Sequence, residues 1–528
     1  MPHLPVSAII ALVLGSSLAV VSAQVEPAPP HHHLVEVSIP DAQSTQRLID
    51  LDLDLVACQG HAPTSKHMEV IATDADLATL RDAGLDFRVA IRHLEQHHAK
   101  DLAQFGPFPA TLTPPLGQGA MGGHYTLAQM EAILDSFAQN HPGLCTTKVS
   151  LGKSIEGRDI WMVKISDNVS VDENEPELMY DALHHAREPV SMATTLKFMD
   201  DLLTKYGSDP EITYIVDNRE LFFVPCVNPD GYEYNRRTNP GGGGMWRKNR
   251  RGGYGIDLNR NYASFWGLNS GSSGSQSSSS YRGTAPFSEP ETRAVETFAA
   301  SRSFVQVVST HTYTDVLLTP WAYTRGRPEG FGSYDRVGKI ATATTGISHT
   351  PWWIGLGYLG SGTAMDHHHT ARGALSWTPE LGRSNEGGFW PNPTRQVNIA
   401  TRHQPMFRAI AVLSGPNLTD GEVILMTNGV QGSDVKIGML GSQGATGLLA
   451  ASAGTANLPV PGVTGNLLLD PASTVWLAPQ TFGSIGYITL SAMVPVNPAL
   501  VGQSVHFQML HAAGSELVLG NRQTLTVR

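Results

Sequence analysis

The sequence predicts an α/β fold, with a mixed, mostly parallel sheet covered by helices on both faces, a small α+β unit before it and a β-sandwich after it. Three patterns support this prediction. Apolar strand-like runs alternate with helical periodicity between residues 123 and 413, which is typical of βαβ units. Residues 34–94 contain a shorter series of such runs. From about residue 415, charged residues become sparse and Gly, Pro, Ser and Thr separate short apolar runs.

Length and composition limit the classes of protein to consider. The 528 residues exceed what one hydrophobic core organises, so about two to four domains are expected. An apolar fraction of 41% indicates a globular chain, and a formal charge of −11 without long Lys/Arg clusters argues against a nucleic-acid partner. The three cysteines, Cys58, Cys145 and Cys226, are too few for a disulfide framework, so buried unpaired thiols are expected.

The first 23 residues are predicted to be a signal peptide. Residues 6–21 are apolar apart from small residues and too short to span a bilayer comfortably, and a small-residue site ends at Ala23. Cleavage there would give a secreted or extracytoplasmic protein. The segment before this apolar run has no Lys or Arg, which leaves an uncleaved anchor as the alternative. No later stretch is long and apolar enough for a membrane-spanning helix.

Residues 34–94 are predicted to form a ferredoxin-like unit, because their strand-like and helical runs follow the order βαββαβ. The predicted strands are residues 34–39, 55–59, 67–72 and 86–91, and the predicted helices are residues 42–53 and 74–85. Residues 95–120 contain four prolines and few periodic apolar positions, which disfavour both helix and central strand. This stretch is therefore predicted to be a linker.

Residues 121–414 are predicted to form the central α/β domain. Its expected strands are residues 146–150, 160–165, 178–183, 221–227, 305–309 and 374–378. Its expected helices are residues 126–141, a helix from Pro189, residues 289–300, and a closing helix at 395–413 that Pro405 can kink. The sequence Asn228-Pro229-Asp230-Gly231 suits a tight turn. The Gly-rich stretch 241–244 and the Ser-rich stretch 270–280 are expected to be flexible surface insertions.

Residues 415–528 are predicted to form a β-sandwich of roughly a hundred residues, which is a usual size for such domains. Short apolar runs occur at residues 423–426, 467–469, 485–490 and 505–510. The segment contains no catalytic constellation. A stabilising role, or attachment to an unknown target, is the expected function.

A candidate metal site begins at the carboxyl end of the strand 178–183. His185 and Glu188 follow this strand, and Pro189 opens a helix whose apolar residues recur every three or four positions. In open α/β sheets, ligands bind in the crevice beyond the strand ends. His311 follows the apolar strand 305–309 and is a candidate third ligand. Two His and one Glu form a recurring zinc-ligand set that leaves a fourth position for water, so one Zn²⁺ is expected.

Three His-rich runs, at residues 31–33, 93–98 and 367–369, are further places where metal ligands gather. None of them has the His-Glu-x-x-His spacing that places two imidazoles on one face of a helix. A His-rich tract is otherwise a compositional signal, so no functional metal site is predicted at these runs.

Six motifs together give the chain a resemblance to a known family. They are His185-Ala186-Arg187-Glu188, Asn228-Pro229-Asp230-Gly231, Trp246-Arg247-Lys248, Asp257-Leu258-Asn259-Arg260-Asn261, His311-Thr312-Tyr313 and Glu380. In this order and with similar spacing, they resemble the zinc metallocarboxypeptidases of the carboxypeptidase A/B type, from residue 123 to residue 413. Carboxypeptidase A is itself an example of a His₂Glu zinc site. Each motif alone is weak, but six in the family's order are specific.

The resemblance implies hydrolysis of the C-terminal peptide bond of peptides and proteins. His185, Glu188 and His311 would be the zinc ligands. Glu380 would be the general base that takes a proton from the attacking water and passes it to the leaving amine. Arg247 would polarise the scissile carbonyl and stabilise the oxyanion as it forms.

The resemblance also implies a set of substrate contacts. Asn259 and Arg260 would bind the terminal carboxylate, a task suited to the planar fork of a guanidinium group. Tyr358 would close over the bound residue. Arg187 and Tyr313 would contact the substrate further out.

Specificity and the flanking domains follow less directly from the resemblance. Met365 would lie in the side-chain pocket, where B-type enzymes carry an acidic residue, so a preference for apolar or aromatic C-terminal residues is expected. Residues 34–94 resemble the family's inhibitory propeptide in position and element order. The hypothesis is that the protein is a zymogen, in which this unit covers the cleft until the chain is cut between Lys100 and Gly122. The C-terminal domain lies outside the resemblance.

Two alternative functions remain open. The first is a catalytically inactive binding protein that keeps the carboxypeptidase fold and uses its C-terminal domain for attachment. The second is a zinc amidase that acts on a peptidoglycan-type or otherwise modified C-terminus. Such an amidase would share the metal chemistry but would differ in what binds Arg260.

Overall fold

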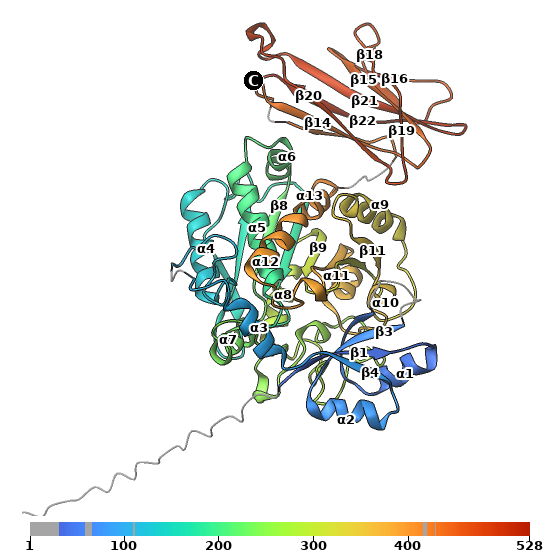
Figure 1. Ribbon diagram of the computed structural model, residues 1–528. Coiled ribbons are helices and arrows are strands. Elements are labelled where there is room, and N and C mark those ends of the chain that lie inside the picture. Colours follow the sequence, from blue (N-terminus) through green and yellow to red (C-terminus); the bar gives the residue numbers. More distant parts are fainter. Residues whose placement is uncertain (1–30, 59–65, 109–110, 416–419, 428) are drawn as a thin grey trace, which may run out of the picture.

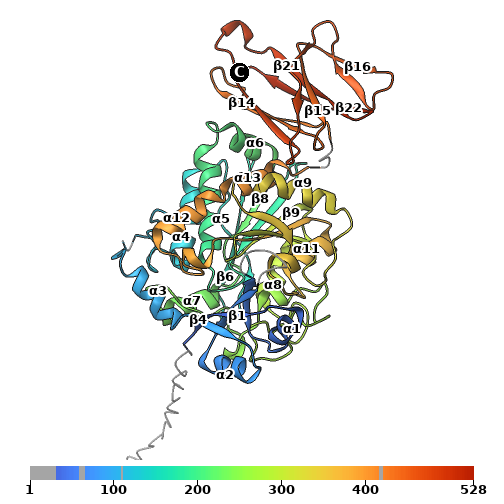
Figure 2. The ribbon, with the colours of Figure 1, turned by 45° about the vertical axis from the view of Figure 1, so that its right-hand side comes forward.

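The structure is a computed structural model that describes residues 31–58, 66–108, 111–415, 420–427 and 429–528. The predicted signal peptide lies outside these residues. Figures 1 and 2 show a central α/β domain with the N-terminal unit and the C-terminal β-domain at opposite ends of it. Within the described part of the chain, no helix is both long and apolar enough to cross a membrane.

The N-terminal unit contains the six elements in the order that the sequence predicts. They are β1 (His33–Ser38), α1 (Ala42–Asp50), β2 (Asp54–Cys58), β3 (His67–Ala72), α2 (Asp74–Asp82) and β4 (Phe87–Ile91). The strands form one antiparallel sheet in the order β2-β3-β1-β4. Asp41 and Thr73 cap the two helices with capping boxes. Val35, Val70 and Leu80 belong to the buried core between sheet and helices.

The predicted linker begins with a helix, α3 (Leu94–Leu102), which the sequence analysis did not predict. Leu94, His98 and Leu102 recur every four residues and are buried, so the helix has one face in a core. His93, His97 and His98 lie at or near this helix and interrupt the apolar pattern, which is why the helix was not predicted.

The central sheet has eight strands in the order β11-β10-β12-β9-β7-β8-β6-β5. They are β5 (Val149–Lys153), β6 (Asp159–Ile165), β7 (Glu177–Ala182), β8 (Glu220–Val224), β9 (Phe304–Thr310), β10 (Val316–Thr319), β11 (Ser348–Pro351) and β12 (Leu375–Glu380). Strands β7, β8, β9 and β12 pair in parallel, and β5 and β6 join antiparallel to their neighbours. Strand β10 is antiparallel to β12 and parallel to the edge strand β11. The mixed, mostly parallel sheet is therefore confirmed.

Helices cover both faces of this sheet (Figure 1). They are α4 (Leu127–Asn140), α5 (Pro189–Lys205), α6 (Pro210–Asn218), α7 (Pro229–Thr238), α8 (Pro290–Ala300), α9 (Phe331–Thr342), α10 (Trp352–Gly355), α11 (Ala364–Arg372), α12 (Pro393–Arg402) and α13 (Gln404–Val412). Strand β7 contributes alternately to two cores: Leu178 and Tyr180 belong with α5 and α13, whereas Met179 belongs with α8. Burial on both faces explains why this strand is apolar almost throughout.

Three local predictions in the central domain need correction or refinement. Asn228 does not open a tight turn: it caps α7, with its Oδ1 accepting the N–H of Gly231 at 3.0 Å. The Gly-rich stretch is not a flexible surface insertion, because residues 242–244 are buried and a Cβ at Gly242 would lie 2.7 Å from Leu102 Cδ1. The single closing helix predicted at residues 395–413 is two helices, because α12 ends at Arg402 and α13 begins at Gln404 with Pro405 in its first turn.

The C-terminal domain consists of antiparallel strands, as predicted. They are β13 (Val423–Met426), β14 (Asp434–Leu440), β15 (Thr446–Ser452), β16 (Thr455–Pro459), β17 (Asn466–Leu469), β18 (Val475–Trp476), β19 (Gln480–Thr481), β20 (Tyr487–Met493), β21 (Ser504–Ala513) and β22 (Glu516–Thr526). The sheet β13-β14-β20 and the sheet containing β15, β21 and β22 share one buried core, which includes Ile437, Leu449 and Met509. Ile424 and Met426 pack instead into the core of the central domain, on the side of α6.

Candidate metal centre

The candidate ligands lie at the carboxyl ends of two adjacent parallel strands. His185 and Glu188 follow β7, and His311 follows β9, which pairs with β7 along its length. Glu188 precedes the first turn of α5, where Pro189 needs no hydrogen-bond acceptor for its nitrogen. The topology thus brings together residues that are more than 120 positions apart in the sequence.

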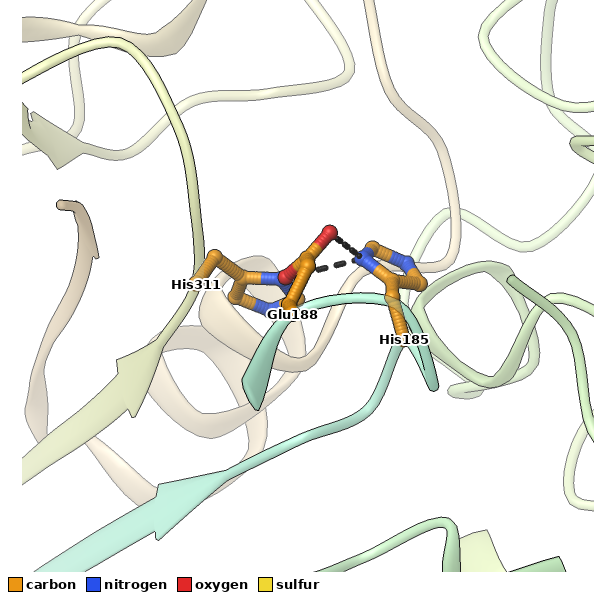
Figure 3. A group of neighbouring side chains, drawn as sticks. All are labelled: His185, Glu188 and His311. Carbon is orange, nitrogen blue, oxygen red and sulfur yellow. Dashed lines mark hydrogen bonds and ion pairs between the residues drawn. The ribbon is translucent and has the colours of Figure 1, made fainter. Parts of the chain in front are cut away.

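The three side chains point toward one another (Figure 3). Nδ1 of His185 lies 2.8 Å from Oε1 of Glu188, Nδ1 of His311 lies 3.0 Å from Oε2, and the two Nδ1 atoms are 3.1 Å apart. All three residues are buried. Their donor atoms are close enough for one small cation to contact all of them. The His₂Glu set fits zinc and leaves room in its coordination for a further ligand.

Asp257 orients the first ligand. Its Oδ1 lies 3.0 Å from Nε2 of His185, and its Oδ2 accepts a hydrogen bond from Arg247 Nη2 at 2.7 Å. Although burial opposes ionisation, Arg247 and His185 hold the pKa of Asp257 well below its usual range. The ionised carboxylate accepts from Nε2 and leaves Nδ1 of His185 free to bind a metal. Sequence reasoning did not assign Asp257 a role, although it lies in a quoted motif.

The electrostatics of the two glutamates at the site differ. Burial disfavours the charge of Glu188, but His185 and His311 outweigh it and hold the pKa of Glu188 well below its usual range. Burial and the charge of Glu188 raise the pKa of Glu380, which ends β12. One carboxylate is therefore suited to bind a cation, and the other is suited to exchange a proton.

A cavity of about 20 Å³ brings most of the predicted site residues together. Its lining includes His185, Arg187, Glu188, Arg247, Arg260, Tyr313, Tyr358 and Glu380. Asn259 lies behind His311, with Nδ2 3.3 Å from its Nε2. Met365 is buried on α11 and does not line this cavity, and the N–H of the preceding Ala364 donates to Oδ1 of Asn259 at 2.9 Å.

Arg260 is a buried guanidinium that forms no ion pair with any acidic side chain in the described part of the chain. Its Nη1 donates to the carbonyl oxygen of Asn259 at 2.8 Å, and its charge lies 5.5 Å from the centre of the Trp352 ring. Its Nε has no hydrogen-bond partner among the described residues. A buried cation in this state is suited to bind an incoming anion.

The N-terminal unit contacts three of the predicted substrate-binding residues. Asp54 forms an ion pair with Arg187, with Nη2 2.9 Å from Oδ1. The hydroxyl of Tyr313 donates to Glu69 at 2.9 Å. The hydroxyl of Tyr358 lies 3.3 Å from the carbonyl oxygens of both Leu55 and Val56. Leu55 and Val56 also line the small cavity, so this unit covers it.

Other histidines near the site have partners of their own. Nε2 of His184 lies 2.8 Å from the Tyr262 hydroxyl, and its ring stacks on His311 with the ring centres 5.6 Å apart. In the His-rich runs, Nε2 of His33 lies 3.1 Å from Asp74 and Nε2 of His367 lies 2.9 Å from Glu296. Cys145 and Cys226 are buried free thiols, as predicted.

Comparisons with known proteins agree with this geometry. The zinc carboxypeptidase family profile matches residues 130–405, which is more than half of the chain. Carboxypeptidase A2 of Rattus norvegicus is 32% identical over 266 residues, 49% of this chain and 60% of that protein. Carboxypeptidase A1 of the same organism is 28% identical over 378 residues, 68% of this chain and 88% of that protein. The first of these matches spans less than two thirds of the relative's length.

Solved structures show the same fold. The crystal structure of carboxypeptidase A from Helicoverpa armigera superposes with a TM-score of 0.60 at 23% identity. The match covers 73% of this chain and 97% of that chain. At this level of identity the likeness concerns the fold alone.

Proposed function

This chain belongs to the zinc carboxypeptidase family, and on that premise we propose that it is a zinc-dependent exopeptidase that hydrolyses the C-terminal peptide bond of peptides and proteins. The observation that carries this proposal is the convergence of buried His185, Glu188 and His311 on one point, beside a cavity that Arg247 and Glu380 also line. Family membership implies one catalytic zinc ion, which these three residues would hold. When bound, zinc supplies Lewis acidity and lowers the pKa of a water molecule to ~7.

Glu380 is the proposed general base. It is buried at the end of β12, where its carboxyl can accept a proton from the attacking water and pass it to the leaving amine. Arg247 is the proposed oxyanion donor. Its guanidinium is fixed by Asp257 and lines the same cavity, so it needs no reorganisation as negative charge develops on the carbonyl oxygen.

Arg260, with Asn259, is the proposed binding site for the substrate's terminal carboxylate. The lack of an acidic partner for Arg260 within the described chain supports this role, because a buried guanidinium is stabilised by an anion that arrives with the substrate. Tyr358 closes over the bound residue, and Arg187 and Tyr313 contact the residues that precede it. This arrangement gives the site a direction, toward the carboxyl end of a chain.

We propose that apolar or aromatic C-terminal residues are preferred. The position that Met365 occupies is acidic in B-type enzymes, and no acidic residue other than Glu188 and Glu380 lines the described cavity. Trp352 lines the same cavity and adds an aromatic wall near Arg260. An apolar side chain gains free energy on leaving water for such surroundings.

Residues 34–94 are proposed to be an inhibitory propeptide in a secreted zymogen. This unit occupies the groups that a substrate would need. Asp54 pairs with Arg187, Glu69 accepts a hydrogen bond from Tyr313, and the carbonyl oxygens of Leu55 and Val56 lie near the Tyr358 hydroxyl. The C-terminal β-domain is proposed to stabilise the central domain or to attach the enzyme to a target, and its packing against α6 supports the first role.

The test compares two peptides that differ only at the C-terminus, one ending in free Phe and the other in Phe amide. The full chain, before and after limited proteolysis, is assayed with zinc present. Release of Phe from the free acid alone is expected. Equal cleavage of both peptides would favour the amidase alternative. Zinc bound without release from either peptide would favour the inactive binding protein.

A further inference from the structure

We propose that the activating cleavage falls between Phe105 and Gly106 and is made by an endopeptidase that selects an aromatic residue on the amino side of the cut bond. The inference rests on the proposed function, because it concerns how residues 34–94 are released from the site. In this step water adds across the Phe105–Gly106 amide, so that the C–N bond breaks, Phe105 gains a carboxylate and Gly106 gains an amine.

The junction between the two domains offers few bonds to a protease that requires Lys or Arg. Between residues 93 and 147 the only such residue is Lys100. Lys100 lies inside α3, where the N–H of Ala103 donates to the carbonyl oxygen of Ala99 at 3.0 Å. Leu102, in the same helix, is buried. Cleavage at Lys100 therefore requires α3 to leave its place and unfold.

Arg92 is the nearest basic residue before this interval, and the bond after it is held in place. The N–H of His93 donates to Nδ1 of His33 at 3.1 Å, and the N–H of Leu94 donates to the carbonyl oxygen of His32 at 2.7 Å. His33 is fully buried. The side chain of Arg92 is exposed. The backbone that follows it is nevertheless hydrogen-bonded to His32 and His33 and is not free to enter a protease cleft.

The segment after α3 has the opposite properties. Residues 103–107 are all exposed and, apart from the turn that ends the helix, have no regular secondary structure. Phe105 is 42% exposed, although a large aromatic side chain gains free energy from burial. Exposed segments of this kind are preferred sites of proteolytic cleavage. The segment contains Phe105 and no Lys or Arg, so an aromatic-selective endopeptidase is the class that it fits.

A cut after Phe105 would release α3 together with the N-terminal unit. The helix is tied to that unit, because Nδ1 of His32 lies 2.5 Å from Oε1 of Glu95 and the N–H of Leu94 bonds to the His32 carbonyl. The ion pair of Asp54 with Arg187 and the contacts of Tyr313 and Tyr358 would then be left to hold the released segment on the site.

The test digests the native full chain with chymotrypsin or with trypsin at matched low doses and maps the first cut by mass spectrometry while C-terminal hydrolase activity is followed. Chymotrypsin is expected to cut first after Phe105 and to raise the activity. Trypsin is expected to leave residues 93–147 intact. A first tryptic cut at Arg92 or Lys100 that activates the enzyme would overturn the inference and leave the proposed function standing.

Variants at Phe105 test whether this residue, rather than another exposed residue of the junction, determines where the chain is cut. Phe105→Ala is expected to slow the chymotryptic cut more than about tenfold, since the aromatic pocket of the protease loses its ligand. Phe105→Arg is expected to make the same bond sensitive to trypsin. Leu112→Ala, at another exposed apolar residue of the junction, is the matched control and is expected to leave the rate unchanged. An unchanged rate in Phe105→Ala would refute the assigned site.

The two proposals fail in different ways. Cleavage after Phe105 with no rise in activity would overturn the inhibitory role of residues 34–94, while the mapped cut would support the assigned site. Activation by a cut elsewhere would overturn the site and support the inhibitory role.

Discussion

Oδ1 of Asp257 lies 3.0 Å from Nε2 of His185, on the side of the imidazole opposite to the candidate metal position. The ring is thereby held with Nδ1 facing Glu188 and His311. Arg247 shares the other carboxylate oxygen, so one buried acid fixes both a candidate ligand and the proposed oxyanion donor. Disturbing Asp257 should therefore affect metal binding before it affects the fold.

Asp257→Asn is expected to weaken zinc binding by about 10–100-fold, which is the usual cost of removing a carboxylate that supports a ligating His. The dissociation constant is measured by competition with a chromophoric chelator. Asp135→Asn, at an exposed carboxylate on α4, is the control. An affinity equal to that of the wild type would mean that Asp257 does not orient His185.

Arg260→Ala is expected to lower kcat/KM for a peptide with a free C-terminus by at least about 30-fold, because truncating one partner of a buried charge pair costs ~2–5 kcal/mol. The loss should appear largely in KM, and the difference between free-acid and amide substrates should shrink. Arg293→Ala on α8 is the control for a lost surface arginine. If discrimination against the amide persists in Arg260→Ala, another group binds the carboxylate.

Asp54→Asn is expected to raise the basal activity of the uncleaved chain. Removing the acid leaves the buried Arg187 without its partner, and breaking a buried pair on one side costs ~3–5 kcal/mol. The N-terminal unit should then leave the site more often. Asp50→Asn, on the exposed side of α1, is the control. Basal activity that is no higher than in the control would contradict the proposed inhibitory contact.

Glu175→Gln is expected to stabilise the protein at alkaline pH only. Burial, followed by the charges of Glu173 and Asp167, raises the pKa of Glu175 to about 7. Since an unfolded Glu titrates near about 4.3, the folded protein holds this proton more tightly, and stability falls as pH rises from that value through about 7. Melting temperatures at pH 4 and pH 8 test this.

The Gln variant should melt higher than the wild type at pH 8, and the difference should disappear at pH 4. Glu329→Gln, at an exposed residue, controls for the loss of one negative charge. A stabilisation of the same size at both pH values would show that the titration of Glu175 is not its cause.

Much of the site followed from the sequence because its residues stand at strand ends. His185, Glu188 and His311 each follow an apolar run, and parallel strands bring their carboxyl ends to one edge. Asp257 was missed because its role depends on a contact with a residue 72 positions away. The contacts of Asp54 and Glu69 were missed for the same reason.

The fold was predicted best where the apolar period is long. The start of helix α5 and the bounds of the strands β7 and β9 were predicted within one residue, whereas no helix or strand was predicted in residues 316–372. Strands β10 and β11 have four residues each, too few for a clear alternation. The Gly-rich stretch was predicted to be flexible from its composition alone. In the structure, Gly242 is needed because Leu102 packs so closely against it that a Cβ would clash.

The central claim is that Glu380 acts as the proton-transferring base of a zinc exopeptidase. Its most direct test is the rate at which zinc-loaded, proteolytically activated Glu380→Gln releases Phe from a peptide with a free C-terminal Phe. The variant is expected to bind one zinc ion per chain like the wild type and to lose at least about 10²-fold in kcat. A variant that binds zinc and releases Phe at the wild-type rate would contradict the account.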